Sequence, residues 1–340
     1  MSNLEAAPPE LTCPSIPGTV EVLQPREVPL GGPRAMPVRR TLPQRERSLI
    51  GAWCFLDHYG PDNVAATGGM AVAPHPHTGL QTVSWLFTGE IEHADSAGYH
   101  AMVRPGELNL MTAGRGISHS EYSTPATTVL HGAQLWVALP ADARFTEPAF
   151  EHYAPVPANL PGAVLRVFLG SLAGQDSPVT TFTPLLGAEI LLDAGASLTL
   201  EVRDDFEHGI LVDEGAVSVS GTPLAYAELG YVGPGHASLT LVAGPDPVRL
   251  LLIGGTPLRE SIVMWWNFVG RTHEEILAFR HAWQAEIGAE GAAMGGAAAP
   301  DAASMHDTGP RFGLPAHSRD APLPAPVLPG VRLRPRTNPS

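Results

Sequence analysis

The sequence predicts an all-β protein that folds as two barrels or sandwiches, and three observations lead to this class. The chain of 340 residues is long enough for two cores of ordinary size. Gly occurs 36 times and Pro 35 times, spread between short apolar runs, which is typical of strands joined by turns. The runs alternate apolar and polar residues or are rich in β-branched side chains, and both patterns favour strands. They are Thr82–Phe87, Glu107–Met111, Gln134–Leu139, Val164–Leu169, Ile190–Leu192, Leu198–Val202, Gly209–Val212, Ala216–Val219, Ser238–Val242 and Val248–Ile253.

A Pro-rich stretch divides the chain. Five prolines fall between Pro140 and Pro161, which indicates a connection between two β domains. We therefore expect an N-terminal extension at residues 1–30, a first β domain at 31–145 and a second β domain at 162–287. From residue 288 to residue 340 Ala, Gly and Pro dominate; they bury little surface, so this tail is expected to be flexible.

One helix is predicted near the end of the second domain. Thr272 can cap it, and Glu275, three residues later, completes a capping box. An apolar stripe at helical spacing follows, and it is expected to pack against a barrel. The stripe consists of Ile276, Phe279, Trp283 and Ile287.

Composition excludes several classes of partner and compartment. There are 34 acidic and 20 basic residues, a net charge of −14, which argues against nucleic-acid binding but leaves a basic protein partner open. Cys13 and Cys54 do not make a disulfide framework. The start lacks the features of a signal peptide, and no apolar stretch approaches the roughly 20 residues that span a bilayer. We expect a cytoplasmic monomer that does not bind a membrane.

Two pairs of side chains carry the chemistry of a metal site. His75 and His77 are two residues apart, so on an extended strand both point to the same face. Pro76 between them disfavours a helix, on which this spacing would turn the rings apart. His119 and Glu121 repeat the spacing. Two such pairs on adjoining strands predict four ligands around one metal ion.

The ligand types narrow the choice of metal. Three imidazoles and a carboxylate suit Fe(II), which keeps open positions for water, oxygen or substrate. Zn would have a closed, structural site with four protein ligands. Mn, Ni and Cu stay open on ligand type.

These segments resemble the metal motifs of the cupin superfamily and, more specifically, of the pirin family. Pro74-His-Pro-His-Thr-Gly-Leu-Gln-Thr-Val83 is similar to the first motif, and Thr112-Ala-Gly-Arg-Gly-Ile-Ser-His-Ser-Glu121 is similar to the second. Gly89–Gly98 between them and Met264–Val269 in the second domain are similar as well. The resemblance covers roughly residues 20 to 290.

The resemblance implies two cupin (double-stranded β-helix) barrels that face each other. The first holds the metal, the second is degenerate, and a C-terminal helix and a flexible tail follow. It implies that the ligands are His75, His77, His119 and Glu121 and that the metal is iron. Gln81 departs from the general cupin pattern, which has Glu at this position, so Glu121 supplies the carboxylate.

Two classes of function follow from the resemblance. One is a metal-dependent dioxygenase of quercetinase type that acts on a flavonol-like aromatic substrate with O2, with Glu121 as the catalytic general base. The alternative is a non-enzymatic, redox-sensitive iron-binding regulatory protein that binds a protein partner. A metal-stabilised scaffold without catalysis is a third class.

Other histidines are interpreted more simply. His208 and His236 are single, without a partner two residues away, so the second domain is expected to lack a metal. His93 precedes Asp95 by two residues and is interpreted as a surface side chain, with a proton carrier at the pocket entrance as the alternative. His58 is interpreted as structural.

Overall fold

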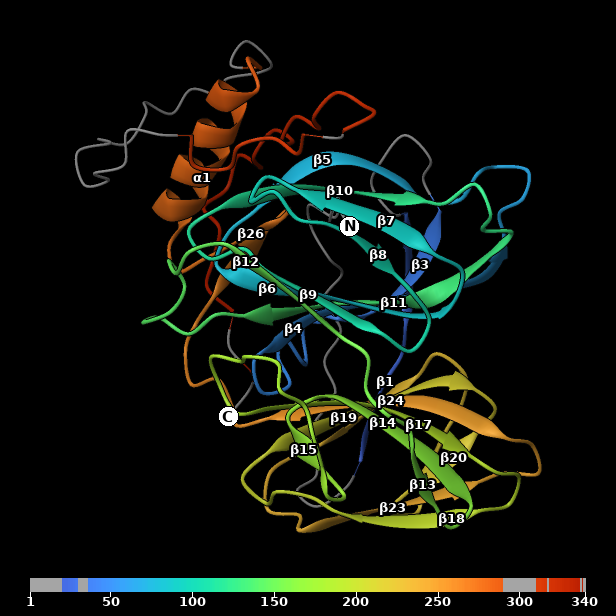
Figure 1. The fold of residues 1–340 in the computed structure, drawn as a ribbon. Coiled ribbons are helices and arrows are strands. Elements are labelled where there is room, and N and C mark those ends of the chain that lie inside the picture. The colour runs from blue at the N-terminus through green and yellow to red at the C-terminus, as the bar shows by residue number, and fades with distance from the viewer. Residues whose placement is uncertain (1–19, 30–35, 290–309, 317, 337, 339–340) are drawn as a thin grey trace.

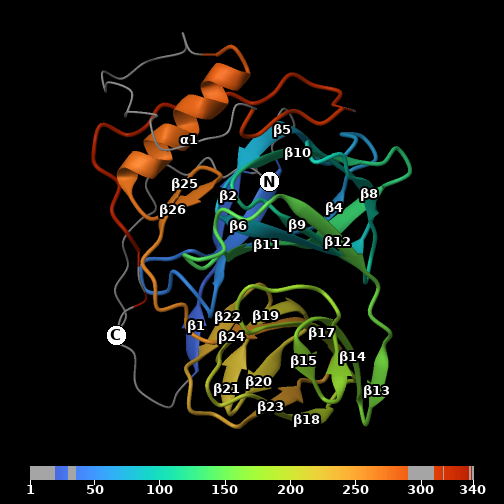
Figure 2. The ribbon, with the colours of Figure 1, turned by 60° about the vertical axis from the view of Figure 1, so that its left-hand side comes forward.

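A computed structural model describes residues 20–29, 36–289, 310–316, 318–336 and 338. Within them the chain forms two β barrels that face each other, and a helix packs on the outside of the first barrel (Figures 1 and 2). This arrangement confirms the predicted all-β class with two cupin barrels and a C-terminal helix. The described part of the chain holds no helix that is long and apolar enough to cross a membrane.

The first barrel consists of a seven-stranded and a four-stranded antiparallel sheet. The larger sheet has the order β12-β9-β6-β11-β4-β3-β2, and the smaller has the order β5-β10-β7-β8. The strands of the larger sheet are β2 (Arg26–Pro29), β3 (Pro37–Leu42), β4 (Trp53–Asn63), β6 (Leu80–Thr88), β9 (Leu108–Thr112), β11 (Val129–Ala138) and β12 (Ala149–Tyr153). Those of the smaller sheet are β5 (Ala71–His77), β7 (Ile91–Asp95), β8 (His100–Val103) and β10 (Ile117–Ser123).

The second barrel repeats this plan, with the orders β1-β22-β19-β24-β17-β14-β13 and β18-β23-β20-β21. The larger sheet contains β1 (Glu21–Leu23), β13 (Ala158–Leu160), β14 (Ala163–Leu169), β17 (Leu185–Leu192), β19 (Glu207–Glu214), β22 (Leu229–Val232) and β24 (Val248–Gly255). The smaller contains β18 (Ser197–Glu201), β20 (Val217–Val219), β21 (Thr222–Leu224) and β23 (Ser238–Ala243). Two hairpins complete the strands: β15 (Ser171–Leu172) with β16 (Gln175–Asp176), and β25 (Val263–Trp265) with β26 (Phe268–Gly270).

The two seven-stranded sheets pack against each other through an apolar cluster. Trp85 of the first barrel stacks on Phe168 of the second, with ring centroids 4.5 Å apart. Trp53 Nε1 donates to the carbonyl of Gly254 in the second barrel at 3.0 Å. The interior of the second barrel is filled by an aliphatic cluster drawn from both of its sheets. Close packing between and within the barrels therefore fixes the position of the first barrel relative to the second.

The ten predicted runs all coincide with strands and extend at most one residue beyond them. The course of the chain between the two barrels, however, differs from expectation. The Pro-rich stretch, expected as a connection, contains β12, which joins the first barrel, and β13, which joins the second. From the expected N-terminal extension, β1 pairs with β22 of the second barrel. Prolines flank β12 without entering it, so they permit an edge strand there.

Helix α1 (His273–Glu286) starts as predicted. Thr272 caps it by accepting from the backbone N–H of Glu275. The carboxylate of Glu275 accepts from the backbone N–H of Arg271 at 2.6 Å, and the backbone of Thr272 also hydrogen-bonds to it, as the capping box predicts. Ile276, Phe279 and Trp283 of the stripe are buried against the β25–β26 hairpin and Phe312.

Part of the expected tail makes defined contacts. Residues 290–309 lie outside the described residues. Phe312 is buried against α1, and the Trp283 Nε1–H donates to the carbonyl of Leu323 at 2.8 Å. The backbone of Arg336 pairs with Ile262. The described part of this segment thus wraps α1 and the outside of the first barrel (Figure 2).

Candidate metal centre

Two neighbouring strands of the smaller sheet present the predicted ligands. Strands β5 and β10 are antiparallel, and His75 lies directly opposite His119. Alternation along β5 turns His75 and His77 into the barrel together. The side chains of His75, His77, His119 and Glu121 are all 1% exposed or less. Strand pairing thus brings the two sequence pairs to one place, with a register shift between His119 and Glu121.

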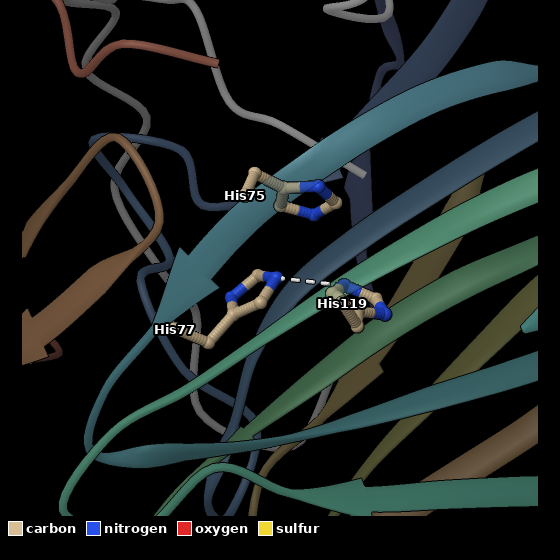
Figure 3. Close-up of side chains that lie close together, drawn as sticks. All are labelled: His75, His77 and His119. Carbon is tan, nitrogen blue, oxygen red and sulfur yellow. Dashed lines mark hydrogen bonds between the residues drawn. The ribbon is translucent and has the colours of Figure 1, made fainter. Parts of the chain in front are cut away.

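The three imidazoles converge (Figure 3). Ring centroids are 5.0 Å apart for His75 and His77, 4.4 Å for His75 and His119, and 4.9 Å for His77 and His119. Nε2 of His77 lies 3.1 Å from Nε2 of His119. One nitrogen of each ring lies within 4.8 Å of the others, as a common ligand sphere requires.

Glu121 belongs to a second, overlapping group. Its carboxylate, an imidazole nitrogen of His93 and one of His119 lie within 4.8 Å of one another. The two groups share His119, and in the described part of the chain no group of this spacing contains all four predicted ligands. Ser84 Oγ, which lies 3.4 Å from Glu121 Oε1 and 2.9 Å from Gln134 Oε1, contacts the carboxylate from β6.

His93 is buried at this centre, so its interpretation as a surface side chain is wrong. It is 3% exposed, and its Nδ1 lies 3.4 Å from Nδ1 of His119. Strand β7 pairs with β10, which places His93 opposite Glu121. His93 Nε2 lies 3.2 Å from Asp95 Oδ2. The His-x-Asp pattern in the sequence was a usable signal, but only the strand pairing shows that it meets His119.

Burial keeps the three converging imidazoles neutral. It lowers the pKa of His75, His77 and His119 well below the ordinary value, and the neighbouring rings add to the effect for His77 and His119. His75 Nδ1 lies 2.9 Å from the carbonyl oxygen of Ala73. Since a carbonyl only accepts, Nδ1 carries the proton and Nε2 keeps its lone pair.

The donor set fits a divalent transition metal. Nε2 of His75 is buried and has no hydrogen-bond partner among the described residues. A buried lone pair of this kind is costly unless something binds it. Neutral imidazoles with one nitrogen fixed by a carbonyl are the form in which histidine binds metals. The arrangement is therefore that of a metal site.

Apolar side chains surround the imidazoles on the side of the larger sheet. The ring of Trp136 stands edge-on to His77, with centroids 5.2 Å apart, and stacks on Phe55 at 4.0 Å. Gln81, at the position of the missing Glu, donates instead to Thr112 Oγ1 at 2.9 Å. These neighbours exclude water from the imidazoles. Glu121 is then the acidic side chain that strands β5 and β10 supply.

Comparison with known proteins identifies the family. The Pirin family model matches residues 35–137, which contain the whole centre, and the model of the Pirin C-terminal cupin domain matches residues 187–287. The chain belongs to the pirin family. One similar protein, from Pseudomonas aeruginosa, is named "Putative quercetin 2,3-dioxygenase PA1205" and is 44% identical over 76% of this chain and 82% of that protein. A "Pirin-like protein" of Caulobacter vibrioides is 34% identical over 73% of this chain and 88% of its own length.

A solved structure is similar over nearly the whole chain. The crystal structure titled quercetin 2,3-dioxygenase from Acinetobacter baumannii has a TM-score of 0.81 and 35% sequence identity. The alignment covers 93% of this chain and 97% of the other. Both barrels of this pirin-family chain therefore have counterparts in a single known structure.

Proposed function

We propose that this protein is a metal-dependent dioxygenase of quercetinase type, which acts on a flavonol-like aromatic substrate with O2. The observation that carries the proposal is the buried, neutral imidazole cluster of His75, His77 and His119 with Glu121 beside it. The names of the P. aeruginosa relative and of the A. baumannii structure support the same class of reaction.

In this proposal His75, His77, His119 and Glu121 hold Fe(II). Imidazole and carboxylate ligands are the types that non-haem Fe(II) oxygenases use, and they also accept Mn, Ni, Cu or Zn. When bound, the ion supplies Lewis acidity toward a substrate oxygen and the electron transfer that dioxygen needs. The identity of the ion is decided by elemental analysis of native protein.

Glu121 is the proposed general base. Its carboxylate lies beside His93 and His119, so a substrate hydroxyl that reaches the imidazole cluster is within range of its oxygens. Ser84 contacts Oε1 and holds the carboxylate toward the centre. The proton taken by Glu121 can pass to His93, which Asp95 orients.

Oxygen consumption with a panel of flavonols tests the proposal. Fe(II)-loaded protein is expected to consume O2 with at least one flavonol, and chelated protein is not. Glu121→Gln should lower kcat by about 10²–10⁴-fold, the usual contribution of a general base. Glu201→Gln, an exposed carboxylate of the second barrel, is the matched control and should leave kcat unchanged.

Absence of metal-dependent O2 uptake with every flavonol would exclude this substrate class. If the protein binds the metal but does not turn over any flavonol, this result favours the alternative of a non-enzymatic regulatory protein. Pull-downs under Fe(II) and Fe(III) conditions then decide, because a redox-gated regulator should bind different partners in the two states.

A further inference from the structure

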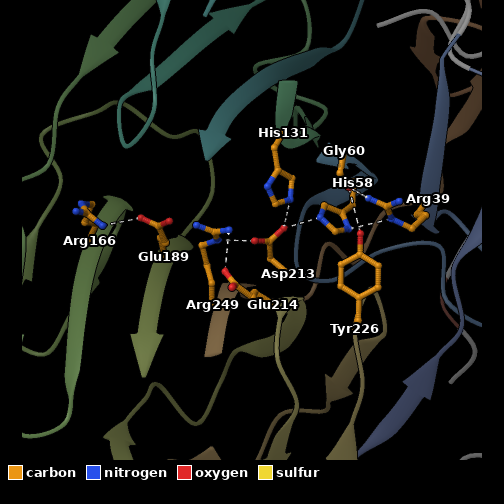
Figure 4. Close-up of polar contacts among 10 residues, drawn as sticks. All are labelled: Arg39, His58, Gly60, His131, Arg166, Glu189, Asp213, Glu214, Tyr226 and Arg249. Atoms are coloured by element: carbon orange, nitrogen blue, oxygen red, sulfur yellow. Dashed lines mark hydrogen bonds and ion pairs between the residues drawn. The ribbon is translucent and has the colours of Figure 1, made fainter. Parts of the chain in front are cut away.

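A second group of metal-binding side chains lies between the barrels (Figure 4). His58 on β4 and His131 on β11 come from the first barrel, and Asp213 on β19 comes from the second. Nε2 of His58 and Nε2 of His131 each lie 2.6 Å from the same carboxylate oxygen, Oδ1 of Asp213. Three potential ligand atoms from three strands thus converge within 4.8 Å.

These side chains are buried, and one of them is incompletely satisfied. The side chains of His58 and Asp213 are 0% exposed and that of His131 is 6% exposed. His58 Nε2 forms a hydrogen bond to Asp213, but His131 Nε2 is buried without a hydrogen-bond partner among the described residues, despite its short distance to Oδ1. Its direction therefore suits a third atom better than the carboxylate oxygen itself.

The surroundings set the charge state of the group. Burial lowers the pKa of His58, so that the ring is neutral and carries a single proton. Burial alone would raise the pKa of Asp213, but the two imidazoles beside Oδ1 outweigh it, so the pKa is lowered and the carboxylate is ionised. Arg249 binds the other oxygen, Oδ2, and Glu214 binds Arg249 at 3.1 Å. Oδ1 is left to face the two imidazoles.

We propose that His58, His131 and Asp213 form a second divalent metal site, which fastens the two barrels together and takes a first-row ion such as Zn²⁺. Two imidazoles and a carboxylate are common ligands of Zn²⁺, with a fourth position for water. Arg249 would orient the carboxylate from its outer oxygen, as partners of metal ligands commonly do. The site is separate from the pirin-family centre and does not depend on the proposed dioxygenase reaction.

Arg39 is the side chain that opposes the ion. Its Nε lies 3.4 Å from Nδ1 of His58, and a second guanidinium nitrogen donates to the carbonyl of Gly60. When an ion takes the lone pair of His58 Nε2, the single proton of the neutral ring must sit on Nδ1, where it faces the Arg39 donor. Removing the guanidinium should therefore tighten binding, whereas a purely structural hydrogen-bond cluster gives no reason for this.

Metal stoichiometry of the full chain tests the inference. Chelated protein is titrated with Zn²⁺, with Co²⁺ as a spectroscopic probe. Wild type is expected to bind two ions and His119→Ala one, which isolates the new site. Adding Asp213→Asn or His131→Gln to His119→Ala should abolish binding, and adding Arg39→Met should tighten it. Glu189→Gln, which changes another buried carboxylate of the same sheet, is the matched control and should keep one ion.

Each result of the titration either supports or overturns the second metal site. If His119→Ala binds no ion, or binds one that Asp213→Asn and His131→Gln both leave in place, the inference is overturned. Should either variant fail to fold, the melting temperature of His119→Ala with and without Zn²⁺ replaces the titration. A rise on adding Zn²⁺ supports the site, and an unchanged value refutes it.

Discussion

Arg40 illustrates how a buried charge is tolerated in this protein. The side chain is 1% exposed and its guanidinium donates to both carboxylate oxygens of Asp57, at 2.6 and 2.8 Å. It also lies over the ring of Phe55, 4.4 Å from the centroid. Phe55 in turn stacks on Trp136 beside His77. The ion pair therefore supports the wall of the candidate metal centre.

Removal of this guanidinium should destabilise the protein strongly. Arg40→Met leaves Asp57 buried and unpaired, and the expected loss in free energy of unfolding is about 3–5 kcal/mol. The double variant Arg40→Met/Asp57→Leu should recover most of it, since no charge is then left uncompensated. Denaturant unfolding measures both. The exposed pair of Arg104 and Glu90 is the control, and Arg104→Met should cost about 0–1 kcal/mol.

His208 should make the second barrel sensitive to acid. Burial first, and His236 second, lower its pKa from 6.5 to about 4, and both ring nitrogens lack hydrogen-bond partners among the described residues. Because the pKa in the folded state lies below the unfolded value, its stability contribution is intact above pH 6.5 and is lost as the pH falls toward 4.

The variant His208→Leu should therefore flatten the stability profile. Wild type should lose roughly 2–3 kcal/mol more than the variant between pH 7 and pH 4.5. At pH 7 the variant should be as stable as wild type or more so, because an unpartnered polar side chain is removed. Denaturant midpoints across this pH range give the comparison; parallel profiles would contradict it.

At the scale of single elements, the turn between β5 and β6 fixes the end of strand β5, which carries the candidate ligands His75 and His77. Gly79, two residues after His77, has φ +68°. A Cβ at this position would lie 2.2 Å from the carbonyl oxygen of Val269 in β26. Thr78 O accepts from the N–H of Val269 at 3.1 Å, so β26 rests directly on this turn.

The variant Gly79→Ala should disturb both stability and the metal centre. Backbone strain together with the clash should cost about 2–4 kcal/mol, and displacement of the turn should weaken metal binding through His77. Gly98→Ala is the matched control. Gly98 has φ +95° but no atom within 4 Å, so only strain of about 1 kcal/mol is expected. Equal losses in the two variants would show that the contact with Val269 is unimportant.

Strand type could be predicted from the sequence far better than strand pairing. The apolar and β-branched side chains of Thr82–Phe87 and Val248–Ile253 indicate strands directly, and both runs are almost wholly buried. Strand β12 has no such signal: its side chains are half-buried or exposed, because it lies at the edge of its sheet on β9. The local sequence pattern does not indicate with which neighbouring strand an edge strand pairs.

At the scale of the molecule, the interface between the barrels should couple their unfolding. Phe168 is fully buried on Trp85 of the other barrel. We expect one cooperative transition for wild type. Phe168→Ala should lose about 3–5 kcal/mol and should broaden or divide the transition in calorimetry. Phe182→Ala, at an exposed position, should change stability by no more than about 0.5 kcal/mol. A single unshifted transition in Phe168→Ala would contradict this coupling.

The candidate sites show where prediction from the sequence stops. His75 and His77 could be assigned to one face because alternation within a strand is a local property. His93 joined them only through the pairing of β7 with β10, and Asp213 meets His58 across two barrels. Contacts between residues so distant along the chain depend on packing, which no local pattern encodes.

The place of β1 has a consequence for synthesis on the ribosome. This strand begins at Glu21, yet its partner β22 begins at Leu229. At translation speeds of about 5–20 residues per second, β1 waits on the order of 10–40 s for that partner to emerge. During this interval the first barrel can close, but the tryptophans that later meet the second barrel face water. The nascent chain is thus exposed to aggregation, and in need of a chaperone, after the strands that carry the candidate metal ligands have already folded.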